Sequence, residues 1–315
     1  MAYVGLATQQ RRNNIRSLTL VVLFPFLVVG LTYAAIAAFV FWGYNDSSTS
    51  PISLINEMFI QVAPVIFGGV LVWFVIAYFA NTLIIQNATQ AVPLSRKENM
   101  RVYNLVENLC MSVGMPMPKI NVIEDSALNA FASGLSNSTY TVTLTRGIIN
   151  HLNDEELEGV IAHELSHIRH RDVRLLIISI VFVGIFSMIA QLGFRALLYG
   201  GNRRNSKNDK GGGILLLVIV MLVAAVGYLL SILMRFAISR KREYLADAGA
   251  AEITKKPWAL ASALRKISGN SNPQKQTPDD IAQLFIEHTP RKAAFTSLFA
   301  THPPIEKRIE VLEQF

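Results

Sequence analysis

The sequence predicts an α-helical membrane protein with four transmembrane helices and an additional α+β domain outside the membrane. Two compositional features favour this class: 51% of the 315 residues are hydrophobic and only 16% are charged, whereas a soluble domain carries about 25% charged residues. In addition, four stretches long enough to cross a bilayer contain no charged residue. The single cysteine, Cys110, excludes an intrachain disulfide framework and a cysteine-rich metal module. An ordinary soluble enzyme and a disordered chain are therefore excluded.

The four uncharged stretches are the expected membrane spans. They are Ser17 to Asn45, Met58 to Ser95, Leu175 to Phe194 and Gly211 to Met234. A transmembrane helix needs about 20 apolar residues, and each stretch can supply them. The first is too long for the core of a signal peptide and is followed by no small-residue cleavage site, so we expect it to be retained.

The distribution of Lys and Arg predicts the orientation in the membrane. Twelve of these residues flank the spans on the side of the termini, against five on the other side, so both termini are expected in the cytoplasm. The same asymmetry explains the net charge of +7 without a nucleic-acid partner. The basic loop 195–210 breaks the pattern, which leaves open whether the third and fourth stretches span fully.

The spans divide the chain into four expected parts. These are the first two transmembrane helices (1–85), a first part of the extramembrane domain (86–172), a transmembrane hairpin (173–236) and a C-terminal part of the same domain (237–315).

The extramembrane parts show alternating helix and strand signals. Ser95 and Glu98 form a capping-box pattern that opens a helix to about Val113, and Gly114 with the following Met-Pro-Met-Pro ends it. Further short elements follow along the chain. We expect strands at Ile120 to Ile123, Ala130 to Ala132 and Tyr140 to Leu144, and helices from Asn153 or Asp154, from Pro257 to near Gly269, and from Ile305 to Leu312.

A motif with metal-binding spacing lies in the helix that begins near Asp154. It reads His163-Glu164-Leu165-Ser166-His167. Histidines at i and i+4 lie about 6 Å apart on one helix face, so both imidazoles can reach one Zn²⁺ at about 2.0–2.1 Å. Glu164 is then placed to take a proton from a water molecule at the metal. The alternative is an ordinary solvated polar face of the helix.

A catalytic zinc takes three protein ligands, and Glu243 is the candidate for the third. Measured from the ends of the third and fourth spans, His167 and Glu243 would lie about 12 Å and about 13.5 Å outside the membrane at 1.5 Å per residue. Asp247 is one turn further on and could accept the free N–H of a liganding histidine. Spacing alone leaves a second interpretation open, in which these charges are solvated anchors after a span.

Taken together, these motifs resemble the HtpX-type membrane metalloproteases, relatives of the CAAX prenyl proteases among the thermolysin-like, glutamate-liganded zincins. The resemblance covers most of the chain and rests on motifs in a fixed order. They are the two N-terminal spans, Gly114 to Pro118, Asn129 to Ala132, the pentad 163–167, the membrane hairpin, Glu243 to Asp247, and Thr301-His302-Pro303 ahead of Arg308. It implies a zincin-type α+β catalytic domain on the cytoplasmic side.

The resemblance also implies roles for individual residues. One Zn²⁺ per subunit would be bound by His163, His167 and Glu243, with Glu164 as general base and then general acid and Asp247 orienting a ligand. The implied substrate contacts are an edge strand with Asn129, Ala130 and Phe131, and oxyanion donors His302 and Arg308. An ordinary edge strand, a helix-start histidine and a surface arginine are the respective alternatives. His151, His170 and His288 match no liganding position, and we interpret them as surface histidines.

The implied function is that of a membrane-bound, zinc-dependent endopeptidase of the multi-pass inner (cytoplasmic) membrane. Its partners would be the lipid bilayer and protein substrates, namely misfolded or damaged membrane proteins, cleaved at the cytoplasmic face. Cleavage within the bilayer is excluded by the charges around the pentad. A non-catalytic zinc-binding scaffold or carrier is the alternative, although carriers need ionisable residues inside their spans. The sequence does not indicate the oligomeric state, the cleavage preference or the role of residues 270–300.

Overall fold

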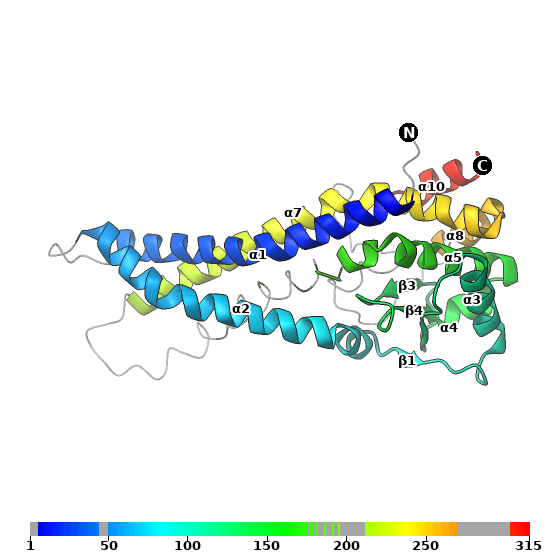
Figure 1. Ribbon diagram of the computed structural model, residues 1–315, viewed down its shortest axis with the longest axis horizontal. Helices are drawn as coiled ribbons and strands as arrows, with labels where there is room; N and C mark the ends of the chain where they lie inside the picture. Colours follow the sequence, from blue (N-terminus) through cyan, green and yellow to red (C-terminus); the bar gives the residue numbers. More distant parts are fainter. Residues whose placement is uncertain are drawn as a thin grey trace. The chain divides into compact units, whose positions relative to one another are not determined.

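The structure is a computed structural model that describes most of the chain (Figure 1). The described residues are 6–43, 50–175, 177, 178, 181, 186, 191, 195, 212–269 and 303–315. The chain forms two compact units. The first unit comprises residues 1–17, 79–177 and 235–315, and the second comprises residues 18–78 and 178–234.

The described elements follow the expected order of long helices and short strands. The helices are α1 (Leu6–Gly43), α2 (Pro51–Thr89), α3 (Met100–Ser112), α4 (Arg146–His151), α5 (Asp154–His170), α7 (Gly212–Thr254), α8 (Pro257–Ser268) and α10 (Ile305–Leu312). The strands are β1 (Val92–Pro93), β2 (Lys119–Ile123), β3 (Ala130–Ser133) and β4 (Thr141–Thr145).

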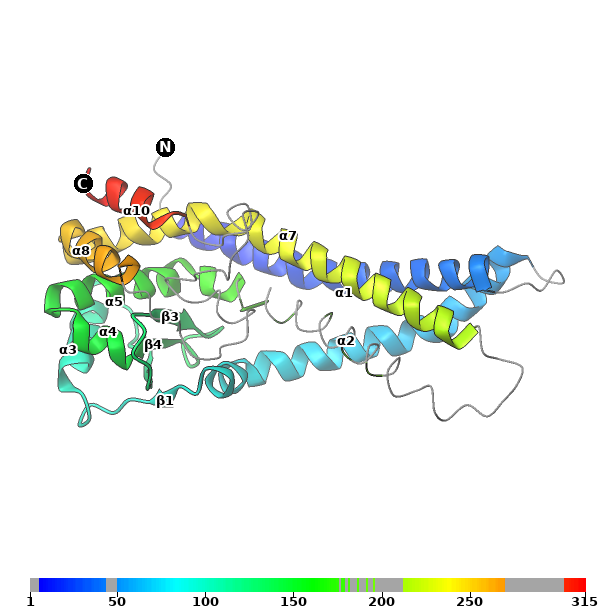
Figure 2. The ribbon, with the colours of Figure 1, turned by 180° about the vertical axis from the view of Figure 1, so that it is seen from behind.

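The second unit contains long apolar helical segments from α1, α2 and α7 (Figure 2). In the described part of the chain, Leu6–Trp42 and Pro51–Thr89 are long and apolar enough to cross a membrane by length and composition. Side chains such as Ile60 and Val65 are more than two-thirds exposed, an arrangement suited to lipid and unfavourable in water. Most of the third expected span lies outside the described residues, and the fourth falls in α7.

Aromatic and β-branched side chains hold the second unit together. Phe24 and Val28 of α1 pack against Val70 of α2 and against Phe186. The rings of Phe24 and Phe186 meet edge to face, with centroids 5.6 Å apart. This geometry stabilises an aromatic pair beyond simple burial.

The first unit contains the sheet, whose strand order is β1-β2-β4-β3. Strands β2 and β4 are parallel, and β3 is antiparallel to β4 with Phe131 opposite Thr143. The turn between β3 and β4 needs Gly134, which has φ +108° and lies too close to the backbone of Thr139 to accept a Cβ. The three strands predicted from the sequence are confirmed, and β3 lies at an edge of the sheet.

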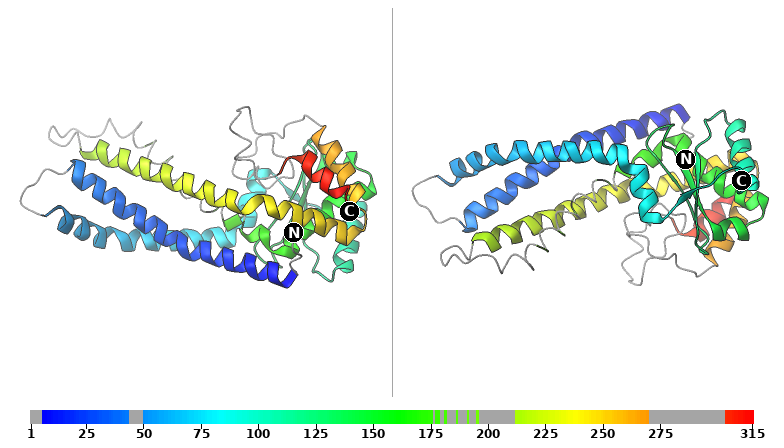
Figure 3. Two further views of the ribbon diagram at one scale, coloured as in Figure 1. Left: turned by 90° about the horizontal axis from the view of Figure 1, so that it is seen from above. Right: turned by 90° about the horizontal axis from the view of Figure 1, so that it is seen from below.

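The helix with the histidine pentad, α5, is the centre of the first unit. It packs on β3 and β4, on α3 and on α8, and α10 packs on α8 (Figure 3). The side chain of Asn153 accepts a hydrogen bond from the Glu156 backbone, and Glu156 reaches back to the Asn153 N–H. This capping box begins α5 where the sequence predicted it.

One local prediction needs correction, and one short helix was not predicted. Helix α3 begins at Met100 rather than near Ser95, because Asn99 caps it by accepting from the Val102 N–H. Glu98 accepts from the Ser95 N–H at 2.6 Å, but this pair closes a separate turn before the helix. The short helix α4 was not predicted, since its six residues are too few to show a helical period.

Candidate active site

The polar side chains of the pentad lie on a buried part of α5. The side chain of His163 is 1% exposed and that of His167 is 14% exposed. Glu164 is also buried. These side chains of the pentad therefore face other groups of the protein instead of solvent. The alternative of a solvated polar face is therefore wrong.

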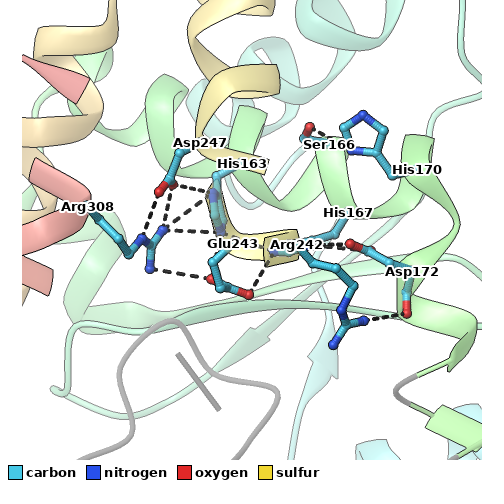
Figure 4. A network of polar contacts seen from close by, with 9 residues as sticks. All are labelled: His163, Ser166, His167, His170, Asp172, Arg242, Glu243, Asp247 and Arg308. Carbon is cyan, nitrogen blue, oxygen red and sulfur yellow. Dashed lines mark hydrogen bonds and ion pairs between the residues drawn. The ribbon is translucent and has the colours of Figure 1, made fainter. Parts of the chain in front are cut away.

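The two histidines and Glu243 converge on one point (Figure 4). The two Nε2 atoms are 3.1 Å apart, and the Glu243 carboxylate lies 3.7 Å from Nε2 of His163 and 3.6 Å from Nε2 of His167. Two ligands at 2.0–2.1 Å from a tetrahedral ion lie about 3.3 Å apart. The ligand atoms of all three residues lie within 4.8 Å of one another, so this group has the size of a metal site.

A carboxylate contacts the other ring nitrogen, Nδ1, of each histidine. Nδ1 of His163 is 2.9 Å from Asp247 Oδ1, and Nδ1 of His167 is 3.0 Å from Asp172 Oδ2. A carboxylate at Nδ1 favours the tautomer with its proton on that nitrogen, which leaves the Nε2 lone pair free for a cation. Two lone pairs 3.1 Å apart repel each other unless a proton or a metal ion lies between them.

A buried arginine completes the polar surroundings of His163, which we call the His163 side of the site. Arg308 of α10 donates from Nε and Nη2 to the two carboxylate oxygens of Asp247, at 2.9 Å and 2.7 Å. Its Nη1 is 3.5 Å from Glu243 Oε2. The guanidinium is fully buried, and these two carboxylates compensate its charge.

The electrostatics of this side follow from burial and from the paired charges. Burial alone lowers the pKa of His163, but its hydrogen bonds with Asp247 and Glu243 outweigh this effect and raise the pKa to about 9. For Asp247, burial alone would raise the pKa of the carboxyl group. The nearby Arg308 and His163 outweigh burial and hold this pKa below its ordinary value.

The His167 side has a separate set of partners. Burial lowers the pKa of His167, and the neighbouring Asp172 carboxylate outweighs it, so that the pKa is raised. Arg242 of α7 donates from Nη1 to the backbone carbonyl of Asp172 at 3.1 Å. This bond ties the end of α5 to the helix that carries Glu243.

Comparisons with known proteins identify the family of the chain. The model of peptidase family M48 matches residues 96–315. A "Protease HtpX homolog" of Bacteroides fragilis is 60% identical over 322 residues, covering 100% of both chains. Another of the same name, from Ligilactobacillus salivarius, is 36% identical and covers 97% of this chain and 98% of its own. The chain belongs to peptidase family M48, among its HtpX proteases.

A solved structure is also similar to this member of M48. The crystal structure of S. mikatae Ste24p aligns with a TM-score of 0.46 at 20% sequence identity, covering 98% of this chain and 67% of that one. The M48 membership, the apolar helices and the His-His-Glu group together make the chain a membrane metalloprotease.

The structure places the other predicted M48 site residues as follows. Asn129 precedes β3, and Ala130 and Phe131 lie in it, all three buried at the sheet edge. Arg308 is buried beside Asp247, so the alternative of a surface arginine is wrong. His302 lies outside the described residues.

The histidines expected at the surface differ from one another. His151 is exposed. His170 is half-buried, with Nδ1 3.4 Å from Ser166 Oγ, and burial lowers its pKa, so its expected surface position is corrected. His288 lies outside the described residues.

Sequence reasoning missed Asp172 and Arg242. Asp172 is five residues after His167, a separation that falls outside one helical turn. It meets His167 because Arg171 adopts a left-handed conformation, φ 59°, that ends α5 and changes the direction of the chain. The only signal in the sequence was an acid close after the second histidine.

Proposed function

We propose that this metalloprotease is a zinc endopeptidase whose metal is held by His163, His167 and Glu243. The observation that supports this most strongly is the convergence of the two Nε2 atoms and the Glu243 carboxylate within 4.8 Å, beside the buried Glu164. Two imidazoles and one carboxylate are a known ligand set of catalytic zinc, which keeps a fourth position for water or substrate. When bound, such a zinc ion lowers the pKa of its water to about 7 and polarises the scissile carbonyl.

The residues of the chain have distinct tasks in this proposal. Glu164 takes the proton of the attacking water and delivers it to the leaving amine. Asp247 accepts from Nδ1 of His163 and so keeps Nε2 directed at the metal. Arg308 balances the charge of Asp247 and Glu243, and it places a positive charge where negative charge develops during hydrolysis.

An extended substrate would bind at the edge strand β3. Strand β3 pairs with β4 through one edge, and Asn129, Ala130 and Phe131 lie at its start. Main-chain pairing with a free edge binds peptides irrespective of their side chains. This mode suits a protease whose substrates are misfolded or damaged membrane proteins. His302 would act as a further donor to the oxyanion.

We further propose a topology of four transmembrane helices in the inner membrane. The excess of Lys and Arg on the side of the termini favours termini and catalytic parts in the cytoplasm. The domain boundaries would then be those expected from the sequence. They are 1–85 and 173–236 for the membrane parts, and 86–172 and 237–315 for the catalytic parts.

The decisive experiment compares Glu164→Gln with Glu155→Gln. Glu155 lies on the same helix but is exposed, so it is a matched control. We expect Glu164→Gln to retain stoichiometric zinc and to lose about 10²-fold to 10⁴-fold in the cleavage of casein or of a membrane protein. His163→Ala and His167→Ala should lose the metal as well. A Glu164→Gln enzyme within tenfold of wild type would refute the mechanism.

Sidedness is tested by single cysteines in a Cys110→Ser background. Impermeant maleimide should label cysteines at Ser48 and Ser206 from outside intact cells, and should not label those at Ser136 and Ser268. Labelling at Ser268 without labelling at Ser136 would place His163 and Glu243 on opposite sides of the membrane. That outcome would contradict the proposed zinc site itself.

A further inference from the structure

The first turns of α1 belong to the same compact unit as α5, although they lead into a long apolar helix. Gln10 Nε2 donates to the carbonyl of Arg169 at 2.7 Å, and Asn13 Nδ2 donates to the carbonyl of His170 at 3.0 Å. Asn13 is 8% exposed. A segment that serves only to anchor the chain would direct such amides into solvent. Here they face the end of the pentad helix.

These two bonds complete the C-terminal end of α5. The last four carbonyls of any helix lack partners within the helix. In α5, the backbone N–H of Arg171 donates to the carbonyls of His167 and Ile168. Gln10 and Asn13 supply the donors for the last two carbonyls, those of residues 169 and 170. All four carbonyls of this helix end are therefore satisfied, two of them by α1.

The completed end positions the next residue. Arg171 has φ 59°, a left-handed conformation that is costly for a residue with a Cβ, so its surroundings must hold it. This turn returns the chain so that the Asp172 carboxylate meets Nδ1 of His167 at 3.0 Å and 3.2 Å. The start of α1 is thus linked to His167 through the hydrogen bonds of Gln10 and Asn13 to the end of α5, the turn at Arg171 and the Asp172 carboxylate.

We infer that Gln10 and Asn13 are positioning residues of the metal site. They hold the last turn of α5 and, through the Arg171 turn and Asp172, orient the His167 imidazole. This inference rests on the proposed function, in which His167 binds zinc. It assigns the start of α1 a role in metal binding in addition to membrane anchoring.

The test uses variants that keep side-chain size and remove the donor. They are Gln10→Met and Asn13→Leu, alone and combined, with Asn14→Leu as the matched control. Asn14 is a half-buried amide of the same helix, and it makes no hydrogen bond to α5 among the described residues. The readouts are zinc affinity, by competition with a chelator, and hydrogen exchange of residues 168–173, on the full chain in detergent.

We expect the combined variant to bind zinc about tenfold more weakly, at the low end of the 10–100-fold loss that accompanies removal of a group orienting a ligand. Exchange at 168–173 should accelerate, while exchange in β2 stays unchanged and reports an intact fold. Asn14→Leu should remain within about twofold of wild type. Wild-type zinc affinity in the combined variant would overturn the inference.

A double-mutant cycle tests the route through Asp172. Asp172→Ala should itself lower zinc affinity about 10–100-fold. If Gln10 and Asn13 act through Asp172, removing them in the Asp172→Ala background should lower zinc affinity by less than a further factor of about two. A further full tenfold loss would overturn the inference. A wild-type protein that binds no zinc would instead refute the proposed function, before any variant is compared.

Discussion

His163 and His167 lie one turn apart on α5, yet their surroundings differ. His163 contacts Asp247, and Arg308 binds both oxygens of that carboxylate. His167 contacts Asp172, and Arg242 donates to the backbone carbonyl of Asp172. The His163 side chain is 1% exposed, whereas that of His167 is 14% exposed.

The difference separates two ways of holding a metal ligand. On the His163 side, two cationic groups face the carboxylates of Asp247 and Glu243, so the buried charges balance one another without contact to solvent. On the His167 side, the orientation depends on the backbone turn at Arg171 and on the α1 amides that hold it. We therefore expect substitutions on the first side to act mainly on stability, and those on the second side to act mainly on metal binding.

The largest effect is expected from Arg308→Leu, which leaves Asp247 and Glu243 buried without their arginine. Breaking a buried ion pair by removing one partner costs about 3–5 kcal/mol. The matched variant Arg242→Leu removes a half-buried arginine that donates to a carbonyl, and should cost about 1–2 kcal/mol. Denaturant unfolding in detergent measures both. Equal losses would show that the two sides do not differ in this way.

A medium effect is expected at Gly249 of α7, which lies against Ser166 of α5. A Cβ on Gly249 would overlap Ser166 Oγ and lie 3.1 Å from Ser166 Cβ. Gly249→Ala should therefore destabilise the fold by about 1–3 kcal/mol, whereas Gly269→Ala, with no neighbour closer than 3.4 Å, should cost less.

Combining Gly249→Ala with Ser166→Ala removes the overlapping hydroxyl and should restore most of the lost stability. Thermal unfolding of the single and double variants provides the measurement. If the double variant is no more stable than Gly249→Ala alone, the close approach of the two helices is not the cause of the loss.

The smallest effect is expected in the pH dependence of zinc affinity, which tests the raised pKa of His163. With a pKa of about 9 in the metal-free protein, His163 is protonated at neutral pH, and zinc must displace this proton. Zinc affinity should therefore rise about tenfold per pH unit up to about pH 9, or about 1.4 kcal/mol per unit. Zinc titrations at pH 7 and pH 8 measure the slope, and an affinity independent of pH would contradict the prediction.

The same raised pKa affects the metal-free protein. A group whose pKa is higher in the folded state stabilises the fold below its unfolded pKa, here about 6.5. That contribution is lost as the pH rises through about 9. Asp247→Asn weakens the hydrogen bond that contributes most to the raised pKa of His163. The free energy of unfolding of this variant should therefore fall less than that of wild type between about pH 6.5 and about pH 9.

Features that depend on neighbouring residues could be predicted from the sequence. The histidine spacing follows from 3.6 residues per turn, and the start of α5 at Asn153 or Asp154 was predicted from the acidic residues of its first turn. The strands β2 and β4 were recognisable from their β-branched residues, whereas β3, with the sequence Ala-Phe-Ala-Ser, contains none. Each of these features is decided within about five residues, where local geometry leaves few alternatives.

The surroundings of the two histidines were decided only by the tertiary structure. Arg308 meets Asp247 from 61 residues away, and Asn13 meets His170 from 157 residues away. Such contacts leave no periodic pattern in the sequence, because they depend on how whole helices pack. A buried charge tolerates only a close and well-oriented partner, so the packing of α1, α7 and α10 determines which polar residues around α5 become part of the site.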